Sequence, residues 1–317
     1  MNKRSCTNTA VATLVGLVFA ASTVPVLADD VDQYSDWSAP VNIGPEVNTV
    51  FGELAPFISK NGLSLYFFSD RPEGFGSNDI YVSQRASVDD PWGPPQNLGS
   101  TINTAFNENA PTLTRDGHRL YFATDRPGGI GGLDLYVSRR HNKRNDFAWR
   151  PPENLGSGVN SVGDDAAAAH FEDDESGTIT LYFQSNRSGG DDIYASVLNE
   201  DGDDENFGAA VLVPELSSPA LDRLPGIRRD GLEIFISSNR PGTLGLLDLW
   251  VSTRASTAEP WSTAVNLGPV INSGFVDGRA MLSFDGTVLY FHSTRPGGVG
   301  FFDLYVSQRT KDDEDDD

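Results

Sequence analysis

The hydrophobic residues of this chain come in short runs that recur five times, with polar turns between them. Each copy has a nearly continuous apolar run (LYFF at 65–68), an arginine, a glycine-rich stretch and a second apolar run (DIYVS at 79–83). A fixed period filled with short strands and glycine-rich turns is typical of a β-propeller. The arginine falls at Arg71, Arg126, Arg187, Arg240 and Arg295, in steps of 55, 61, 53 and 55 residues.

Each copy predicts four strands. The first is a short run such as 53–58, and it ends in an Asn-Gly or Asp-Gly turn (61–62 in the first copy), a pair that tolerates positive φ and favours a hairpin. The second strand is the continuous apolar run, which predicts burial on both faces. The third is the DIYVS-type run, and the fourth is a segment that begins with tryptophan, such as 92–98.

The two ends of the repeat array are expected to meet. The last copy lacks a fourth strand, and a spare tryptophan-led segment, 37–43, precedes the first copy. If this segment completes the last blade, the ring closes and no strand edge is left exposed. We therefore predict an all-β fold: a single five-bladed propeller of four-stranded antiparallel blades over residues 37–310, with about 55 residues per blade.

The residues outside the ring indicate export. Residues 1–28 combine a charged start, a short apolar core and small residues before a cleavage site, which predicts a signal peptide. A short linker, 29–36, follows, and 311–317 is an acidic tail expected to be disordered. We expect a periplasmic or secreted protein after cleavage near Ala28. The apolar core is too short for a membrane span, so no membrane insertion is expected.

The charge of the chain limits its partners. It carries 23 Lys and Arg against 45 Asp and Glu, a net charge of −22, and removal of Lys3 and Arg4 leaves 21 against 45, or −24. Such a field repels nucleic acid. The one cysteine, Cys6, lies in the predicted signal peptide, so the mature protein has no disulfide. A closed ring without a free edge strand favours a monomer.

The repeat also carries a family resemblance. Its pattern is Glu-x-x-Pro, then Asp-Gly-x-x-Leu-Tyr-Phe-x-Ser-x-Arg-Pro-Gly-Gly, then Asp-Leu-Tyr-Val-Ser. It resembles the WD40-like β-propeller repeats of TolB-type envelope proteins and the repeats found beside OmpA-like domains. The resemblance implies an interaction module of the bacterial envelope. Because no OmpA-like domain is present, it does not imply anchoring to peptidoglycan.

Three charged positions recur in every blade. The arginine ends the second strand, one acid begins the first strand and another begins the third. Antiparallel pairing should bring the three together at one end of the blade. The first-strand acids are Glu53, Glu108, Asp165, Asp222 and Asp277, and the third-strand acids are Asp79, Asp134, Asp192, Asp248 and Asp303.

The charged positions have two interpretations. In the first, the arginine bridges both carboxylates of its blade and serves the fold, since a feature present in every repeat is more simply structural. In the second, the five first-strand acids line the mouth of the central channel and bind a ligand or a cation such as Ca²⁺. No cofactor other than Ca²⁺ is expected. His170, in the divergent third repeat, is expected to lie in the core or the channel wall.

Two functional classes remain open. A non-enzymatic, TolB-like module would bind an envelope protein or a cell-wall or glycan ligand. A glycoside hydrolase-like enzyme would instead use a pair of channel carboxylates about 5 to 10 Å apart. We favour the binding module, because a carboxylate paired with arginine has a lowered pKa and is a poor proton donor. We therefore assign no catalytic residue from the sequence.

Overall fold

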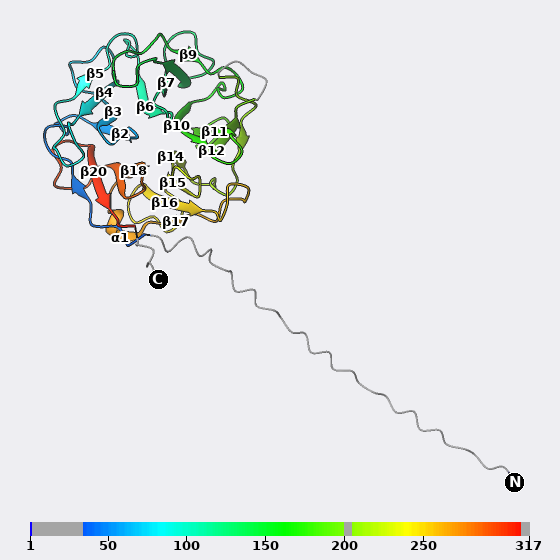
Figure 1. The fold of residues 1–317 in the computed structure, drawn as a ribbon. Helices are drawn as coiled ribbons and strands as arrows, with labels where there is room; N and C mark the ends of the chain where they lie inside the picture. The colour runs from blue at the N-terminus through cyan, green and yellow to red at the C-terminus, as the bar shows by residue number, and fades with distance from the viewer. Residues whose placement is uncertain (2–33, 200–204, 312–317) are drawn as a thin grey trace.

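The computed structural model describes Met1 and residues 34–199 and 205–311. In these residues five four-stranded antiparallel sheets stand around a common axis, which gives the predicted five-bladed all-β propeller (Figure 1). The predicted signal peptide, most of the linker and nearly all of the acidic tail lie outside the described residues. The periplasmic or secreted location therefore stays a prediction.

The strands fall into four concentric sets. The innermost are β2 (Glu53–Ile58), β6 (Glu108–Leu113), β10 (Asp165–Glu172), β14 (Asp222–Ile227) and β18 (Asp277–Leu282). Next come β3 (Ser64–Ser69), β7 (Arg119–Thr124), β11 (Ile179–Ser185), β15 (Glu233–Ser238) and β19 (Val288–Ser293). The third set is β4 (Asp79–Gln84), β8 (Asp134–Arg139), β12 (Asp192–Val197), β16 (Asp248–Thr253) and β20 (Asp303–Gln308). The outermost are β5 (Gln96–Asn97), β9 (Glu153–Asn154), β13 (Val211–Leu212), β17 (Val265–Asn266) and β1 (Val41–Asn42).

The ring closes as the sequence predicts. Strand β1 pairs antiparallel with β20, with Val41 opposite Val306, so the first strand of the chain completes the last blade. The outermost strands have only two residues each, and the predicted tryptophan-led strands are shorter than expected. The tryptophans instead lie under arginines: the Arg85 guanidinium is 4.3 Å from the ring centre of Trp92. The one helix of the described residues is the single turn α1 (Gly268–Ile271).

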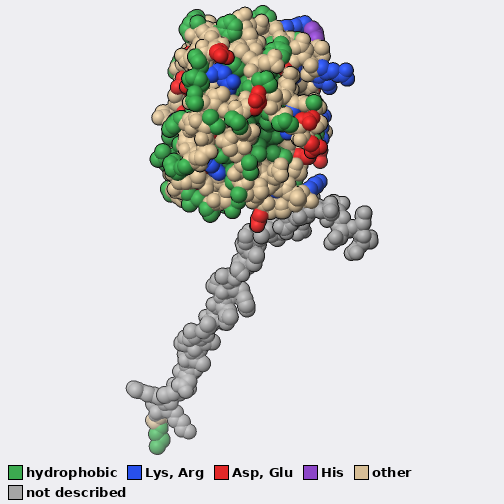
Figure 2. All heavy atoms as spheres, turned by 90° about the vertical axis from the view of Figure 1, so that its left-hand side faces the viewer, with side chains coloured by type: hydrophobic (Ala, Val, Ile, Leu, Met, Phe, Trp, Pro, Cys, Tyr) green, Lys and Arg blue, Asp and Glu red, His purple; other side chains and the backbone are tan. Residues whose placement is uncertain are grey.

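The cores lie between neighbouring blades. The second-strand aromatics Phe67, Phe122, Phe183 and Phe291 are fully buried, which explains why these strands are apolar on both faces. In the described part of the chain no helix is long and apolar enough to cross a membrane. Figure 2 shows charged side chains of both signs among hydrophobic ones on the outer side of the ring.

Each innermost strand contains a bulge at the same place. The register of β2 with β3 shifts between Leu54 and Phe57, and Ala55 inside the bulge has a φ of 48°. A non-glycine residue in this region of φ is strained, and here it recurs in all five blades. The corresponding residues are Ala55, Ala110, Ala167, Leu224 and Arg279.

Candidate functional site

The repeated arginines pair with the first-strand acids inside each blade. The N–O distance is 3.0 Å for Arg71–Glu53 and 2.6 Å for Arg295–Asp277. The other three pairs are Arg126–Glu108, Arg187–Asp165 and Arg240–Asp222. All five carboxylate side chains are fully buried. Burial raises the pKa of Glu53, although hydrogen bonds from Thr49 and the charge of Arg71 oppose the shift.

The third-strand acids have a different role, because they hold the turn that precedes their own strand. Asp134 accepts hydrogen bonds from the backbone N–H groups of Ile130 and Gly131 and so holds the glycine-rich turn. The same turn contacts recur at Asp79, Asp248 and Asp303, whereas Asp192 accepts from the Ser188 hydroxyl. Among the described residues, the ion pairs join each arginine to the first-strand acid alone, so the expected double bridge forms only on one side.

The first-strand acids therefore do not face an open channel mouth. Glu53 illustrates this, since it accepts bonds from Thr49, Ser69 and Arg71 and has no exposed surface. Within the described ranges, no group of three or more His, Cys, Asp or Glu side chains is placed to hold a metal ion. Binding of a ligand or of Ca²⁺ at these acids stays a prediction that would require the pairs to open.

The axis of the ring is filled by an arginine. Arg279 occupies the bulge position of the fifth blade, where the other blades have alanine or leucine, and only 1% of its surface is exposed. Its guanidinium donates hydrogen bonds to the Ala167, Ala168 and Pro225 carbonyls and to the Thr112 hydroxyl. It thus joins the fifth blade to the second, third and fourth blades.

The charge of Arg279 has no carboxylate partner in the described part of the chain. Its Nε also lacks a hydrogen-bond acceptor there. Burial lowers the pKa of Arg279 to about 10, so the side chain remains cationic at neutral pH. A second cation placed on the axis would be repelled by this positive charge.

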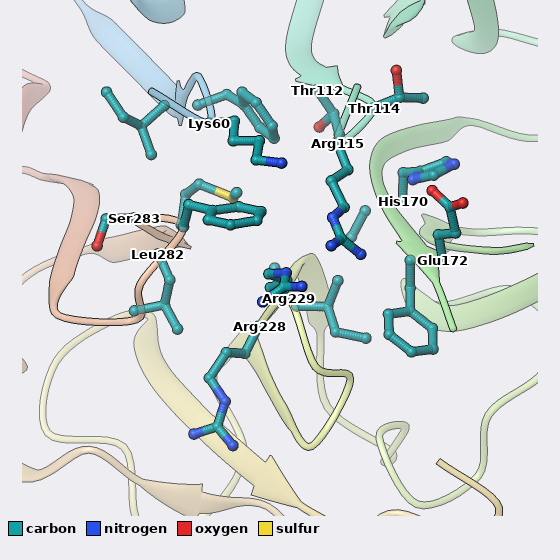
Figure 3. A pocket seen from close by; sticks show the side chains of 18 of the residues that line it. Lys60, Thr112, Thr114, Arg115, His170, Glu172, Arg228, Arg229, Leu282 and Ser283 are labelled. Atoms are coloured by element: carbon teal, nitrogen blue, oxygen red, sulfur yellow. The ribbon is translucent and has the colours of Figure 1, made fainter. Parts of the chain in front are cut away.

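A pocket partly lined by Arg279 lies at the other end of the innermost strands from the buried acids. Figure 3 shows side chains that line it. We call this pocket the funnel. Its rim is formed by the turns that follow the innermost strands, and the cavity itself measures about 90 Å³. This is less than the roughly 300–1,000 Å³ of common ligand pockets, so a ligand would fill the cavity and extend onto the rim. Glu53 and Ser59 are six positions apart along the strand, so the two ends lie at most about 20 Å apart.

Basic and aromatic side chains dominate the funnel. The Lys60 Nζ lies 4.6 Å from the centre of the Phe284 ring, and the guanidinium groups of Arg115 and Arg229 lie 5.6 and 4.7 Å from it. Figure 3 shows Lys60, Arg115 and Arg229 converging from three sides, whereas Arg228 points away. These cations come from the first, second and fourth blades.

The third blade supplies one carboxylate in the funnel, Glu172, and one beside it, Asp174. Asp174 forms ion pairs with both Arg115 and Arg229, and more than half of its side chain is exposed. Glu172, the last residue of β10, lines the funnel and takes part in no ion pair among the described residues. His170 is two residues earlier, on the same face of the strand. Its ring stacks on Tyr121, and burial together with the charge of Arg119 lowers its pKa to about 4.

The first-strand acids, which are the ligand candidates from the sequence, lie at the other end of the innermost strands from this pocket. The sequence predicted His170 in the core or in the channel wall, and the structure places it in the wall of the funnel. Sequence reasoning missed Lys60, Arg115 and Phe284, although a signal was present. Each of these residues stands two positions before the glycine of its turn, and this site holds lysine, arginine or phenylalanine in different blades. A site whose residue type varies within an otherwise recurring turn is the signal.

The comparisons with known proteins agree with the fold. No protein-family model matches the chain, and no curated protein sequence does either. The α-L-arabinofuranosidase from Lactobacillus brevis is 16% identical with a TM-score of 0.59, over 86% of this chain and 94% of that one. A GH62 hydrolase in complex with xylotriose is 13% identical with a TM-score of 0.57, over 87% and 99%. A putative TolB from Agrobacterium tumefaciens is 16% identical with a TM-score of 0.51, over 86% and 91%.

These likenesses correct the functional expectation from the sequence. The similar solved structures are mostly glycoside hydrolases, and only one of those compared above is TolB-like. The prediction of a non-enzymatic, TolB-like binding module was therefore wrong. The sequence misled us because the repeated residues that carry the resemblance build blades, and blades are shared by binders and enzymes. No family model supports the WD40-like repeat assignment.

Proposed function

We propose that this protein acts on a glycan, as a hydrolase of glycosidic bonds, and that the funnel is its sugar site. The observation that carries the proposal is the funnel itself: a pocket on the propeller axis, lined by Phe284 and by polar groups from every blade. Apolar surface combined with a few convergent polar groups is the usual composition of a small-ligand site. The frequency of glycoside hydrolases among the similar structures supports the proposal.

One carboxylate lines the funnel, and a second lies beside it, paired with two of the lining arginines. Glycosidases use a pair of them, one to protonate the leaving oxygen and one to act as base or nucleophile. Glu172 lines the funnel without an ion pair among the described residues, so it is the candidate proton donor. Asp174 is held by Arg115 and Arg229 and supplies the second carboxylate. The two are two residues apart, which limits their Cα separation to about 7 Å.

The test is release of sugar from a panel of oligosaccharides that includes xylotriose, arabinose-substituted xylan fragments, galactotriose and trigalacturonate. The wild-type chain should release sugar from at least one of them. Glu172→Gln should lower the rate by at least about 100-fold, because it removes a general acid while keeping the shape of the side chain.

Glu175→Gln is the matched control. Glu175 is exposed in the same turn and does not line the funnel, so its substitution should leave the rate unchanged. Sugar binding without any release would contradict the hydrolase, and equal rates for both variants would contradict the role of Glu172. Binding and release that survive with Asp174→Asn would exclude Asp174 as the second carboxylate.

A further inference from the structure

We propose that the funnel selects a glycan whose sugars carry an anionic group, a carboxylate as in uronic acids or a sulfate ester, over a neutral one. The inference rests on the proposed function only in that the ligand is a sugar. It concerns which class of sugar the funnel takes. Neither the repeat pattern nor the names of the similar structures indicate an acidic sugar.

The first observation is a local reversal of charge. The chain as a whole has a net charge of −22. The funnel, however, is lined by five cationic side chains and by one carboxylate, Glu172. The cations are Lys60, Arg115, Arg228, Arg229 and Arg279. Arg228 points away and pairs with carboxylates of its own blade, and Asp174, beside the funnel, pairs with Arg115 and Arg229. A cationic cleft in an acidic surface attracts an anionic ligand and guides it inward, because the surrounding surface repels the same ligand.

The second observation is the buried cation below the rim. Arg279 is 99% buried, and its four hydrogen bonds all go to neutral oxygens. Its Nε has no partner in the described part of the chain. A buried charge without a counter-charge is costly. An anionic group that enters the funnel would supply the counter-charge that the protein itself does not.

The third observation is that the three rim cations have a single carboxylate partner among them. Lys60 takes part in no ion pair among the described residues, and Arg115 and Arg229 share the single carboxylate of Asp174. All three cations also lie 4.6 to 5.6 Å from the centre of the Phe284 ring. The ring gathers them at one place, and the planar arginine groups suit a carboxylate or sulfate through paired bonds.

A matched pair of ligands tests the inference. Trigalacturonate and its fully methyl-esterified form have the same length and shape, but only the first is charged. We expect isothermal titration of the full chain to give at least tenfold tighter binding for the acid at 50 mM salt. We also expect that preference to shrink at 500 mM salt, because salt screens the cations. Galactotriose and a sulfated galactotriose form the second pair, and they tell a carboxylate site from a general oxyanion site.

Variants test which cations cause the preference for the acidic sugar. Lys60→Gln should weaken trigalacturonate binding by about two- to fivefold, as expected for an exposed charge, and should leave the binding of the methyl ester unchanged. Arg279→Met should weaken it more than tenfold. Lys60 is exposed and outside the core, so its variant reports on binding even if Arg279→Met fails to fold.

Arg223→Gln is the matched control. It removes one positive charge at the opposite end of the ring, where Arg223 pairs with Asp191. It should leave the affinity for trigalacturonate unchanged, and a loss as large as that of Lys60→Gln would overturn the location. Equal affinity of the acid and its ester would overturn the anionic preference while leaving a glycan-active protein. Failure of every sugar to bind would overturn both proposals.

Discussion

The two ends of the innermost strands are built from the same repeat, but they differ in burial, in regularity among the blades and in whether a pocket is present. At the acid end, each blade places an Arg–acid pair with a fully buried carboxylate, as in Arg240–Asp222. At the turn end, the corresponding positions differ among the blades, and Lys60, Arg115 and Phe284 meet around a pocket. The acid end is regular and closed, whereas the turn end is irregular and open.

The difference teaches how to find a site in a repeat protein. A residue that serves the blade is needed in every blade, so it repeats. A ligand on the axis is met by all five blades at once, and each blade can contribute a different group. The most informative residue is then the one that breaks the pattern deep in the ring, and here it is Arg279 among three alanines and a leucine.

The largest expected effect is at the acid end. Asp222→Ala leaves the Arg240 guanidinium buried without its counter-charge, so we expect a loss of about 3–5 kcal/mol in the free energy of unfolding. Urea denaturation of the variant and the wild type measures it. Arg223→Gln, next to it but partly exposed in its pair with Asp191, should cost no more than about 1 kcal/mol. A loss below 1 kcal/mol for Asp222→Ala would contradict a structural role for the pair.

A pH titration compares one histidine from each end. Burial lowers the pKa of both His292 and His170 to about 4, whereas an unfolded histidine titrates near 6.5. The unfolded chain therefore binds more protons than the folded chain between pH 4 and pH 6.5. The free energy of unfolding is highest above pH 6.5 and decreases as the pH falls toward 4. The loss is on the order of 3 kcal/mol for each group.

The variant His292→Gln isolates that contribution. Near His292, Asp277 raises the pKa and Arg279 lowers it, while the Ala55 N–H donates to its Nδ1. We expect His292→Gln to reduce the difference in unfolding free energy between pH 7 and pH 4. The carboxylates that also titrate in this range are common to both proteins. An unchanged difference would show that His292 is not the responsible group.

A smaller effect is expected at the rim of the funnel. Asp174→Asn removes an exposed carboxylate shared by Arg115 and Arg229, so the free energy of unfolding should fall by less than about 1 kcal/mol. The affinity for trigalacturonate should rise by about two- to fivefold, because both arginines lose their competitor. Calorimetry with the same ligand measures it, and weaker binding would speak against an anionic ligand.

The smallest expected effect on stability is that of Lys60→Gln. The side chain is exposed and outside every core cluster, so unfolding should change by no more than about 0.5 kcal/mol. Thermal denaturation with and without trigalacturonate separates the two roles. The free proteins should melt alike, and the ligand should stabilise the variant less. A large loss of stability in the free protein would show that Lys60 serves the fold, as the acid-end residues do, and not binding alone.

The sequence by itself determined the fold. The period of the arginines, the hairpin turns and the continuous apolar second strands are local patterns, and local patterns are sufficient when each blade contacts mainly its neighbours. The spare segment 37–43 even predicted how the ring closes. The pairing of Arg71 with Glu53 followed from the same antiparallel geometry.

Only the tertiary structure decided which end of the ring is open and what charge it presents. One interpretation of the sequence left the first-strand acids available to a ligand, but packing buries them, as Glu53 is against Thr49, Ser69 and Arg71. Arg279 contacts Thr112 and Ala167, which are 167 and 112 residues away, and no local pattern relates them. The site is thus the product of ring closure, because the axis exists only when all five blades surround it.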